Sequence, residues 1–333
     1  MRIAVFGSGA WGTALAICLC KNGHDVTLWS HNPKKAAEIA LSRVNQSLPG
    51  VRLPDRLKIS GDPGCAADCP IVVIASPSFG IRGVCRAAAP YLAPDAIMVS
   101  VAKGIEPETL LRMSQVVEAE TGHTAVALTG PCHAEEVGRG VPTGCVAACP
   151  DRAKAELVQD AFMSDTFRVY TSPDIVGAEL GGALKNVIAL CAGVTDGLGY
   201  GDNTKAMLMT RGLTELARLG VCLGASKDTF AGLAGVGDLI VTCTSMHSRN
   251  RRAGILIGRG MTPEEAMEEV SAVVEGYYAA KSAYALSQAV GVEMPIVHAA
   301  YAVLYQGAGA AQVVETLMNR SRKPESEDAG WVI

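Results

Sequence analysis

Apolar and polar residues follow two different patterns along this chain. Up to about residue 170, short apolar runs alternate with amphipathic segments of helical period. From Ser172 onward the strand-like runs fade and helical periodicity remains. Alternating strands and helices are typical of buried, mostly parallel sheets. We therefore expect an α/β fold with a Rossmann-type domain over residues 1–171, followed by an all-α domain over residues 172–333.

The predicted elements follow from these periods. The predicted strands are the apolar runs 3–6, 25–29, 71–75, 96–101, 124–128, 144–147 and 167–170. The predicted helices are 13–21, 80–89, 108–119, 176–194, 203–219, 229–233, 253–257, 279–290 and 295–305, with a further helix start at the cap and proline of Thr262-Pro263. Residues 195–203 and 235–245 are predicted to be glycine-rich loops, and the charged tail 320–328 to be loose.

Length and composition narrow the class of protein. A chain of 333 residues favours two domains, and a net charge of −4 gives no reason to expect nucleic acid or an anionic membrane as a partner. The 11 cysteines form no paired Cys-x-x-Cys motif, so we expect no metal site and a reducing compartment. The N-terminus begins with a strand and no apolar run has membrane-spanning length, so we expect a cytoplasmic protein without membrane insertion.

A lysine interrupts the apolar pattern of the segment 176–194. Residues such as Leu180 and Leu184 recur at spacings of three and four, which predicts a helix packed into a core. Lys185 lies about 100° of rotation from Leu184, and Gly181 lies one turn before it. Two interpretations stay open. The glycines allow a substrate or cofactor to approach Lys185 closely, or they permit tight helix packing while the ammonium reaches water.

The first strand ends in a glycine motif that predicts a dinucleotide site. Gly7, Gly9 and Gly12 form a G-x-G-x-x-G between this strand and the following helix. In such motifs the first glycine allows the tight turn, the second lets the backbone approach a pyrophosphate, and the third lets helix and strand pack closely. The N–H groups at the helix start then face the phosphates.

The end of the second predicted strand bears on the choice of cofactor. NAD-specific proteins usually place a carboxylate there for the ribose 2′-OH. This chain has Ser30, His31 and Asn32 instead, followed by Lys34 and Lys35. These residues favour NADP(H) or tolerance of both cofactors, although the two lysines also suit a solvated helix face.

Further candidates for chemistry follow the later strands and the loop 235–245. Lys103 comes just after a buried run, where an anion is expected to bind. His133 suits either an acid–base role or a helix start. Asp238 precedes an Arg249-Asn250 pair, and together these residues have the groups needed to bind a phosphate monoester.

Taken together, these motifs resemble the bacterial type of NAD(P)-dependent glycerol-3-phosphate dehydrogenase. The resemblance covers nearly the whole chain and lies in segments 7–16, 45–49, 103–106, 130–137, 177–190, 196–211, 232–252 and 274–276. It implies reduction of dihydroxyacetone phosphate to sn-glycerol 3-phosphate for phospholipid synthesis in the cytoplasm, with NADP or NAD as cofactor. It also implies a helical domain like that of 6-phosphogluconate dehydrogenase.

The resemblance also implies roles for individual residues. Lys185 is implied to be the proton donor and acceptor, and Lys103 to contact both substrate and nicotinamide nucleotide. The other implied substrate contacts are Gly130, Cys132, Asp238, Ser248, Arg249 and Asn250. The other implied cofactor contacts are Gly7, Gly9, Ala10, Trp11, Gly12, His31, Ala134, Arg249, Val273 and Glu275. Three positions depart from the family pattern, since Ala10 and Cys132 replace the usual serines and His31 stands where arginine is common.

These roles support a simple reaction. Hydride transfer to a carbonyl carbon creates an alkoxide, which an ammonium both stabilises and protonates. Burial and the positive charge of Lys103 are expected to lower the pKa of Lys185 from its usual value of roughly 10.4. We expect Asn186 and Asp238 to help position the site.

Two other interpretations remain. One is a reductase of the β-hydroxyacid dehydrogenase type, and the other is a non-catalytic dinucleotide sensor that binds partner proteins. For the dehydrogenase we expect a small-molecule substrate, and a homodimer through the helical domain is an open option.

Overall fold

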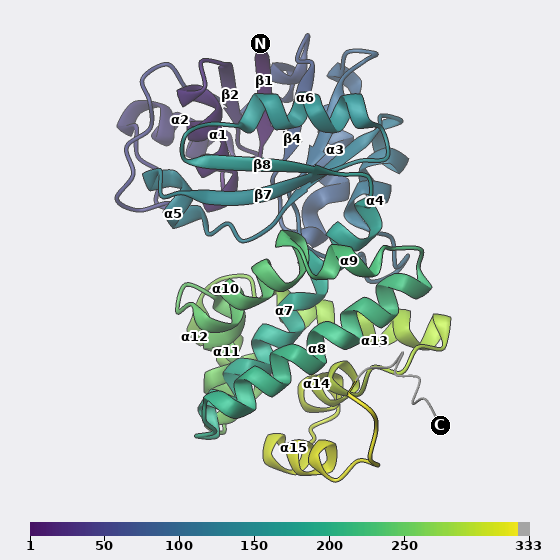
Figure 1. The fold of residues 1–333 in the computed structure, drawn as a ribbon. Coiled ribbons are helices and arrows are strands. Elements are labelled where there is room, and N and C mark those ends of the chain that lie inside the picture. The colour runs from purple at the N-terminus through teal and green to yellow at the C-terminus, as the bar shows by residue number, and fades with distance from the viewer. Residues whose placement is uncertain (326–333) are drawn as a thin grey trace.

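The computed structural model describes residues 1–325 and contains a sheet covered by helices and, below it in Figure 1, a body made of helices alone. The sheet has eight strands in the order β3-β2-β1-β4-β5-β6-β7-β8. Adjacent strands are parallel except β6 and β7, which are antiparallel. The strands are β1 (Arg2–Phe6), β2 (Asp25–Trp29), β3 (Lys58–Ser60), β4 (Ile71–Ile74), β5 (Ile97–Ser100), β6 (Ala125–Thr129), β7 (Thr143–Ala148) and β8 (Phe167–Ser172). The predicted mostly parallel sheet is confirmed.

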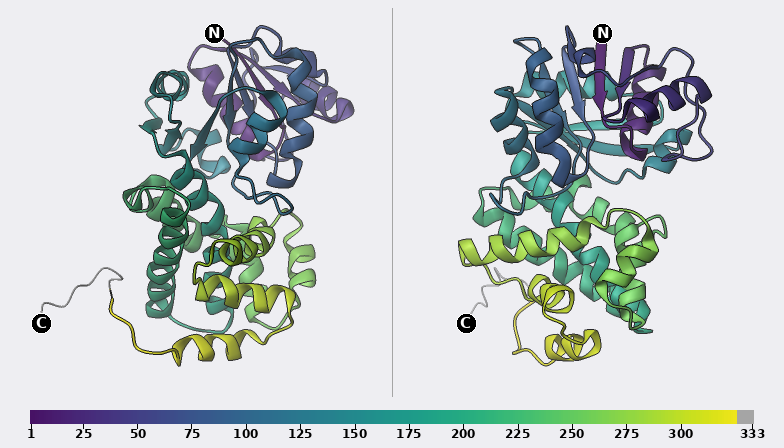
Figure 2. Two further views of the ribbon diagram at one scale, coloured as in Figure 1. Left: turned by 90° about the vertical axis from the view of Figure 1, so that its right-hand side faces the viewer. Right: turned by 180° about the vertical axis from the view of Figure 1, so that it is seen from behind.

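Helices cover both faces of this sheet (Figures 1 and 2). They are α1 (Ala10–Lys21), α2 (Pro33–Ser42), α3 (Ile81–Ala88), α4 (Met113–Thr121), α5 (Ala134–Arg139) and α6 (Arg152–Phe162), with short 3₁₀ turns η1 (Pro63–Ala66), η2 (Ser78–Gly80) and η3 (Ala89–Tyr91). Alternate residues of a strand point to opposite faces. Accordingly, Ile3 and Val5 of β1 join the core under α1 and α6, while Ala4 and Phe6 join the core under α3 and α4. Because both faces are buried, the central strands are continuously apolar.

Two predictions about the first domain are wrong. The short edge strand β3 was not predicted, because three residues with one face half open carry no clear apolar run. The helix predicted from residue 108 begins only at Met113. Leu110 has a positive φ of 58° and Ile105 forms a β-bridge with Arg112, so the residues before α4 fold into a tight turn.

The helical body is built around one long central helix, α7 (Ile175–Gly197), which packs against α8, α10, α11 and α13. The other helices are α8 (Asp202–Cys222), α9 (Lys227–Phe230), the π-helical turn η4 (Leu233–Gly237), α10 (Asp238–Thr244), α11 (Arg249–Gly258), α12 (Pro263–Val270), α13 (Glu275–Val290), α14 (Pro295–Tyr305) and α15 (Ala310–Met318). Since β8 ends at Ser172 and α7 begins at Ile175, the sheet gives way to helices there. A domain boundary at residues 171–172 stays a prediction.

The length and composition of α7 contradict the prediction that no apolar segment is long enough to span a membrane. With 23 residues and a mean hydropathy of 1.5, α7 is long and apolar enough to cross a bilayer, contrary to the prediction that no such run exists. Its most apolar window is 89% buried inside the protein. A helix enclosed by other helices is apolar all round, so it resembles a membrane span in composition.

The segment predicted as the loop 235–245 is helical. The turn η4 and α10 occupy it, with Asp238 as the first residue of α10. A Cβ at Gly235 would lie 2.1 Å from the carbonyl oxygen of Phe230, so its glycine serves close packing rather than a flexible loop. Likewise α11 and α13 begin four residues earlier than predicted, at Arg249 and Glu275, whereas α14 has the predicted bounds.

The charged tail makes two surface ion pairs. Lys323 lies 2.8 Å from a carboxylate oxygen of Glu293, and Arg320 pairs with the same carboxylate. Residues 320–325 are exposed and form no helix or strand, so a loose tail stays a prediction, and residues 326–328 of that segment lie outside the described part of the chain.

Glycines allow α7 and α11 to pack closely where the two helices cross. A Cβ at Gly254 on α11 would lie 2.1 Å from the carbonyl oxygen of Leu190, and one at Gly193 on α7 would lie 2.1 Å from that of Arg251. Gly197 and Gly258 face backbone atoms in the same way one turn further along. The two backbones therefore touch, which brings the start of α11 beside α7.

Replacing Gly254 with alanine should destabilise the protein, because backbone on the facing helix cannot move aside as a side chain can. We expect Gly254→Ala to lower the free energy of unfolding by about 1–3 kcal/mol. The matched control is Gly83→Ala, since Gly83 lies in α3 and, apart from its chain neighbours and the backbone of α3 itself, no atom of the described residues comes within 4 Å of the place its added methyl group would take. That substitution should stabilise the helix by roughly 1 kcal/mol. Thermal unfolding of both variants tests whether Gly254 is needed for the close packing of α7 and α11. Equal melting temperatures of the two variants would contradict that role.

Candidate active site

The glycine turn after β1 has the geometry expected of a pyrophosphate site. Gly7 has a φ of 130°, and a Cβ there would lie 2.3 Å from the carbonyl oxygen of Ala75. A Cβ at Gly12 would lie 2.0 Å from the carbonyl oxygen of Gly7, so α1 packs directly on the turn. At Gly9, by contrast, no atom of the described residues other than its chain neighbours comes within 4 Å of the Cβ position. The surface is open at Gly9, where α1 begins with Ala10 and Trp11 and no side chain caps its N–H groups.

At the end of β2 the structure distinguishes the two lysines considered for a 2′-phosphate. Ser30 is buried and accepts a hydrogen bond from the Ser8 hydroxyl at 2.9 Å. Lys35 donates to the carbonyl oxygen of Ser8 at 3.1 Å, so its ammonium is already bound. His31 and Lys34 are both exposed, and among the described residues the ammonium of Lys34 has no partner. Lys34 therefore remains as the cation available to a ligand.

A buried carboxylate joins two lysines from the two parts of the chain. Lys185 on α7 donates to Oδ1 of Asp238 at 2.5 Å and to the hydroxyl of Thr242 at 2.5 Å. Lys103, three residues after β5, donates to Oδ2 of the same carboxylate at 2.7 Å and to the carbonyl oxygen of Gly130 at 2.9 Å. Asp238 is only 1% exposed and Lys185 only 5%, so both are enclosed by protein. These residues form the candidate catalytic centre.

The glycines of α7 serve packing, while Lys185 does not reach bulk water. A Cβ at Gly181 would lie 2.4 Å from the carbonyl oxygen of Ala234 in η4, and one at Gly182 would lie 2.7 Å from the Thr129 hydroxyl. The glycines thus admit η4 and the end of β6, rather than a ligand. Because η4 rests on Gly181, Asp238 at the following helix start lies within reach of Lys185.

The two lysines of this centre have opposite pKa shifts. Burial lowers the pKa of Lys185 to about 8, with Asp238 opposing this and the positive charge of Lys103 adding to it. Burial also works to lower the pKa of Lys103, but the carboxylate of Asp238 outweighs it and the pKa is raised. Lys103 therefore keeps its charge, while Lys185 is suited to exchange a proton near neutral pH. The expected lowering of the pKa of Lys185 is confirmed.

The residues after β6 border this centre. Gly130 has a φ of 145°, a conformation that favours glycine, and this aims its carbonyl oxygen at Lys103. The thiol of Cys132 donates to the same oxygen at 2.9 Å, and burial raises its pKa, so it stays protonated. His133 precedes α5, and Ala134 is the first residue of that helix.

His133 lies directly before α5, as one of its two interpretations predicted. Its side chain is also near enough to the candidate catalytic centre for the lysine charges there to affect its pKa. Burial lowers its pKa, and the positive charge of Lys185 acts in the same direction. Within residues 1–325 its buried Nε2 has no hydrogen-bond partner. Its ring lies 5.9 Å from that of His247 in the helical body.

The start of α11 contributes one cation and two anchoring side chains. Ser248 caps α11 by accepting from the Arg251 N–H at 3.2 Å. Asn250 donates to the Asn186 side chain at 2.9 Å and accepts from the Gly276 N–H at 2.8 Å, which ties α7, α11 and α13 together. Arg249 is exposed and makes no hydrogen bond or ion pair with another described residue. Its guanidinium is thus available to an anion.

The remaining predicted cofactor contacts lie where α13 meets the sheet. Glu275 accepts a hydrogen bond from the Ser78 hydroxyl at 2.8 Å, which links the start of α13 to the turn after β4. Burial raises the pKa of Glu275, although this hydrogen bond opposes the shift. Val273 is half-buried in the connection just before α13.

Sequence reasoning missed Thr242, which contacts Lys185. Thr242 stands four residues after Asp238, a spacing that places two side chains on one face of a helix. The signal was present in the sequence, but it has meaning only if residues 238–244 are helical, and they were predicted to be a loop.

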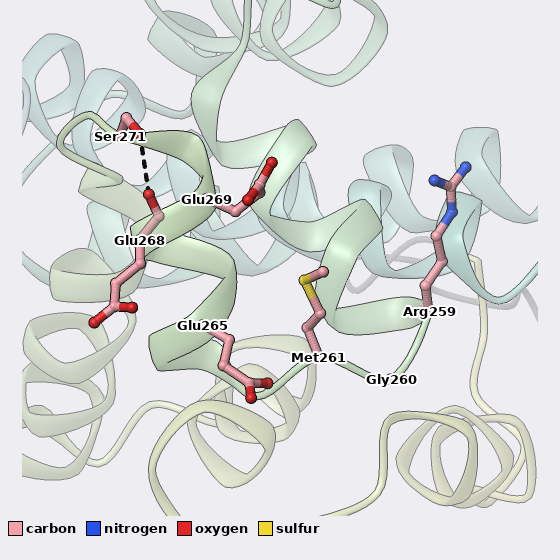
Figure 3. Close-up of a pocket in the computed structure, with 7 residues that line it drawn as sticks. All are labelled: Arg259, Gly260, Met261, Glu265, Glu268, Glu269 and Ser271. Atoms are coloured by element: carbon pink, nitrogen blue, oxygen red, sulfur yellow. Dashed lines mark hydrogen bonds between the residues drawn. The ribbon is translucent and has the colours of Figure 1, made fainter.

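A separate groove of about 760 Å³ lies at the connection between α11 and α12 (Figure 3). It contains none of the candidate residues. Glu265, Glu268 and Glu269 line it, and Arg259 lies at one end. Because carboxylates repel an anionic substrate, its electrostatics favour the lysine centre instead as the site for a phosphorylated molecule.

Comparisons with known proteins agree with this geometry. The family models for the N-terminus and the C-terminus of NAD-dependent glycerol-3-phosphate dehydrogenase match residues 2–155 and 174–315. This chain belongs to that family. It is therefore an NAD(P)-dependent oxidoreductase, and the predicted family, enzyme class and use of NADP or NAD are confirmed. The preference between the two cofactors stays a prediction.

Individual members of the family are similar over almost their full length. The glycerol-3-phosphate dehydrogenase [NAD(P)+] of Fusobacterium nucleatum is 50% identical, with 98% of each chain covered. That of Bacillus subtilis is 48% identical, with 98% of this chain and 96% of the relative covered. The crystal structure of glycerol-3-phosphate dehydrogenase from Coxiella burnetii has a TM-score of 0.91 at 34% identity and covers 96% of this chain and 99% of its own.

The pKa of Lys185 should respond to Asp238 with a defined sign. Since the carboxylate of Asp238 raises this pKa, Asp238→Asn should move it below the wild-type value of about 8. Thr242→Val removes only a neutral hydrogen-bond partner and should cause a smaller shift. An NMR titration of the side-chain ammonium in the three proteins measures the effect. An unchanged or raised pKa in Asp238→Asn would refute the coupling.

Proposed function

We propose that this protein catalyses the reversible NAD(P)H-dependent reduction of dihydroxyacetone phosphate to sn-glycerol 3-phosphate, with Lys185 as proton donor. The observation that carries the proposal is the buried pair of ammonium groups from Lys185 and Lys103 on the carboxylate of Asp238. The names of the relatives that are about 50% identical support the same substrate.

The glycine turn would hold the cofactor. Gly7 and Gly12 keep the turn compact, and Gly9 leaves the backbone open to the pyrophosphate beside Ala10 and Trp11. We include His31, Ala134, Val273 and Glu275 among the contacts, and Lys34 as the cation for a 2′-phosphate. A bound reduced nicotinamide supplies the hydride.

The proton step follows from the charges of the centre. The ammonium of Lys185 donates a hydrogen bond to the C2 carbonyl oxygen and stabilises the negative charge that develops there. It then transfers its proton to that oxygen, and in glycerol 3-phosphate oxidation the neutral amine takes the proton back. A pKa of about 8 suits both directions. Lys103 stays charged and holds the substrate and Asp238 in place.

The substrate phosphate would bind at the start of α11. Arg249 provides a bidentate donor there, and the helix N-terminus favours negative charge. Ser248 and Asn250 fix the position of this helix start through their contacts with Arg251, Asn186 and Gly276. Gly130 and Cys132 would line the other side of the substrate. With three cations and one carboxylate, the site has the positive charge that a phosphate dianion requires.

We infer that the enzyme works in the cytoplasm, where its product supplies glycerophospholipid synthesis. Supporting this, the long apolar helix α7 is buried by other helices and does not face outward. A homodimer through the helical body stays a prediction.

Replacing Lys185 tests the proposal. Lys185→Ala should reduce turnover of dihydroxyacetone phosphate by roughly 10²–10⁴-fold, the usual contribution of a general acid. Cofactor affinity should change little, because the glycine turn is untouched. Absorbance at the nicotinamide band and fluorescence titration with NADPH and NADH measure the two quantities. Retained turnover would contradict the proposal.

Lys185→Arg is the matched control. Arginine keeps the positive charge but does not release its proton at neutral pH, so this variant should also be slow. Wild-type activity in Lys185→Arg would assign the residue an electrostatic role only. Equal turnover of a non-phosphorylated 3-oxo acid by the wild type would favour a β-hydroxyacid dehydrogenase instead.

A further inference from the structure

Glu179 is a buried carboxylate on the helix that carries Lys185. It precedes Lys185 by six residues, which corresponds to roughly 9 Å along the helix axis and about 240° of rotation. The two side chains therefore leave different faces of α7. Glu179 is only 7% exposed. It faces the sheet domain, whereas Lys185 faces α10.

Both oxygens of Glu179 are bound at the start of α4. Oε1 accepts from the Ser114 N–H at 2.7 Å, and Oε2 accepts from the Ser114 hydroxyl at 2.6 Å. Arg112 forms an ion pair with Oε2. Because Ser114 is the second residue of α4, Glu179 satisfies one of the helix-start N–H groups and places negative charge at the favourable end of the helix.

The same connection between β5 and α4 carries Lys103. The structure therefore attaches α7 to residues 101–114 at two points. One is the contact of Glu179 with Ser114 and Arg112, and the other runs from Lys185 through Asp238 to Lys103. Contacts at two points along a helix fix both its rotation and its position along the axis.

Between these two points α7 rests directly on the sheet domain. Gly182 lies one turn after Glu179, and a Cβ there would lie 2.7 Å from the Thr129 hydroxyl and 3.6 Å from Cγ of Lys103. No side chain separates the helix from Lys103 at this point. A shift of α7 would therefore change the geometry of the catalytic centre without an intervening layer to absorb it.

An apolar residue could fill the place of Glu179 at less cost in desolvation. Replacing a buried ion pair by apolar side chains is often neutral or stabilising, so the pair is weak evidence for a role in stability. Directional, charge-assisted hydrogen bonds instead hold the groups that they join in one defined geometry. That property matters where a reacting group must be placed accurately.

We propose that Glu179 is a positioning residue for the reaction, which holds α7 against Ser114 and Arg112 so that the ammonium of Lys185 stays in register with Asp238 and Lys103. The inference rests on the proposed role of Lys185. Glu179 does not touch the reacting atoms, and it acts through the helix.

Glu179→Ala tests this inference in the full-length enzyme. We expect kcat for dihydroxyacetone phosphate to fall by about 10-fold or more, since a displacement of about 1 Å at a reacting group can cost up to 10²-fold. The KM for the cofactor should stay within about twofold, because the hydrogen bonds and the ion pair of Glu179 go to Ser114 and Arg112 and not to the glycine turn. The pH at which kcat declines should also move downward, since a longer distance from Lys185 to Asp238 weakens the contact that opposes the lowering of the Lys185 pKa by burial. Glu179→Gln retains one acceptor oxygen for Ser114 but loses the ion pair with Arg112, so it should lower kcat less than Glu179→Ala does.

Glu215 provides a matched control. It is another buried carboxylate, 5% exposed, that accepts from N–H groups at a helix start, those of Ile296 at 2.8 Å and Val297 at 3.3 Å. Its contacts lie between α8 and α14 and do not involve the sheet. Glu215→Ala should lower the melting temperature without changing kcat or its pH dependence.

The outcomes separate the two proposals. If Glu179→Ala keeps the wild-type kcat and pH dependence while Lys185→Ala is inactive, the positioning role is overturned and the proposed function stands. An active Lys185→Ala would overturn the proposed function first. Should Glu179→Ala fail to fold, Ser114→Ala removes only the hydroxyl, which donates to Glu179 and accepts from Arg112. A smaller fall in kcat with a shifted pH profile would then support the inference, and an unchanged enzyme would overturn it.

Discussion

The shared carboxylate of Asp238 is the contact on which the site depends, because it binds two cations from different parts of the fold. Lys103 comes from the sheet domain and Lys185 from the central helix of the other body. Buried ionic groups are costly to desolvate, and here positive charges outnumber the negative one. The excess positive charge opposes folding and favours the binding of an anion. Burial lowers the pKa of Lys185 to about 8, while Asp238 opposes this shift and the charge of Lys103 adds to it.

The architecture around this contact explains how it is held. Parallel strands bring their carboxyl ends to one edge of a sheet, so Lys103 after β5 and Gly130 after β6 lie together at the edge where such sheets bind ligands. Glycines let η4 and α11 touch the backbone of α7, which delivers Asp238 and the start of α11 to the same place. Close packing, rather than a flexible loop, therefore sets the distances in the site.

Local patterns in the sequence predicted much of the fold. The G-x-G-x-x-G of Gly7 to Gly12, the continuous apolar strands and the stripe of α7 each depend on neighbours within a few residues. What the sequence could not predict depends on contacts between distant residues. The glycines at 235 and 237 indicated a loop, but contact of this segment with Phe230 and Gly181 makes it helical. Whether Lys185 reaches water or stays buried is decided by Asp238, which lies 53 residues away.

The most direct test of this account is a crystal structure of the complex with NADP⁺ and glycerol 3-phosphate. The account predicts that the C2 oxygen lies within hydrogen-bonding distance of the Lys185 ammonium, with the phosphate at Arg249 and the pyrophosphate over Gly9. A substrate bound elsewhere, with the Lys185–Asp238 pair still closed and turned away from it, would contradict the central claim.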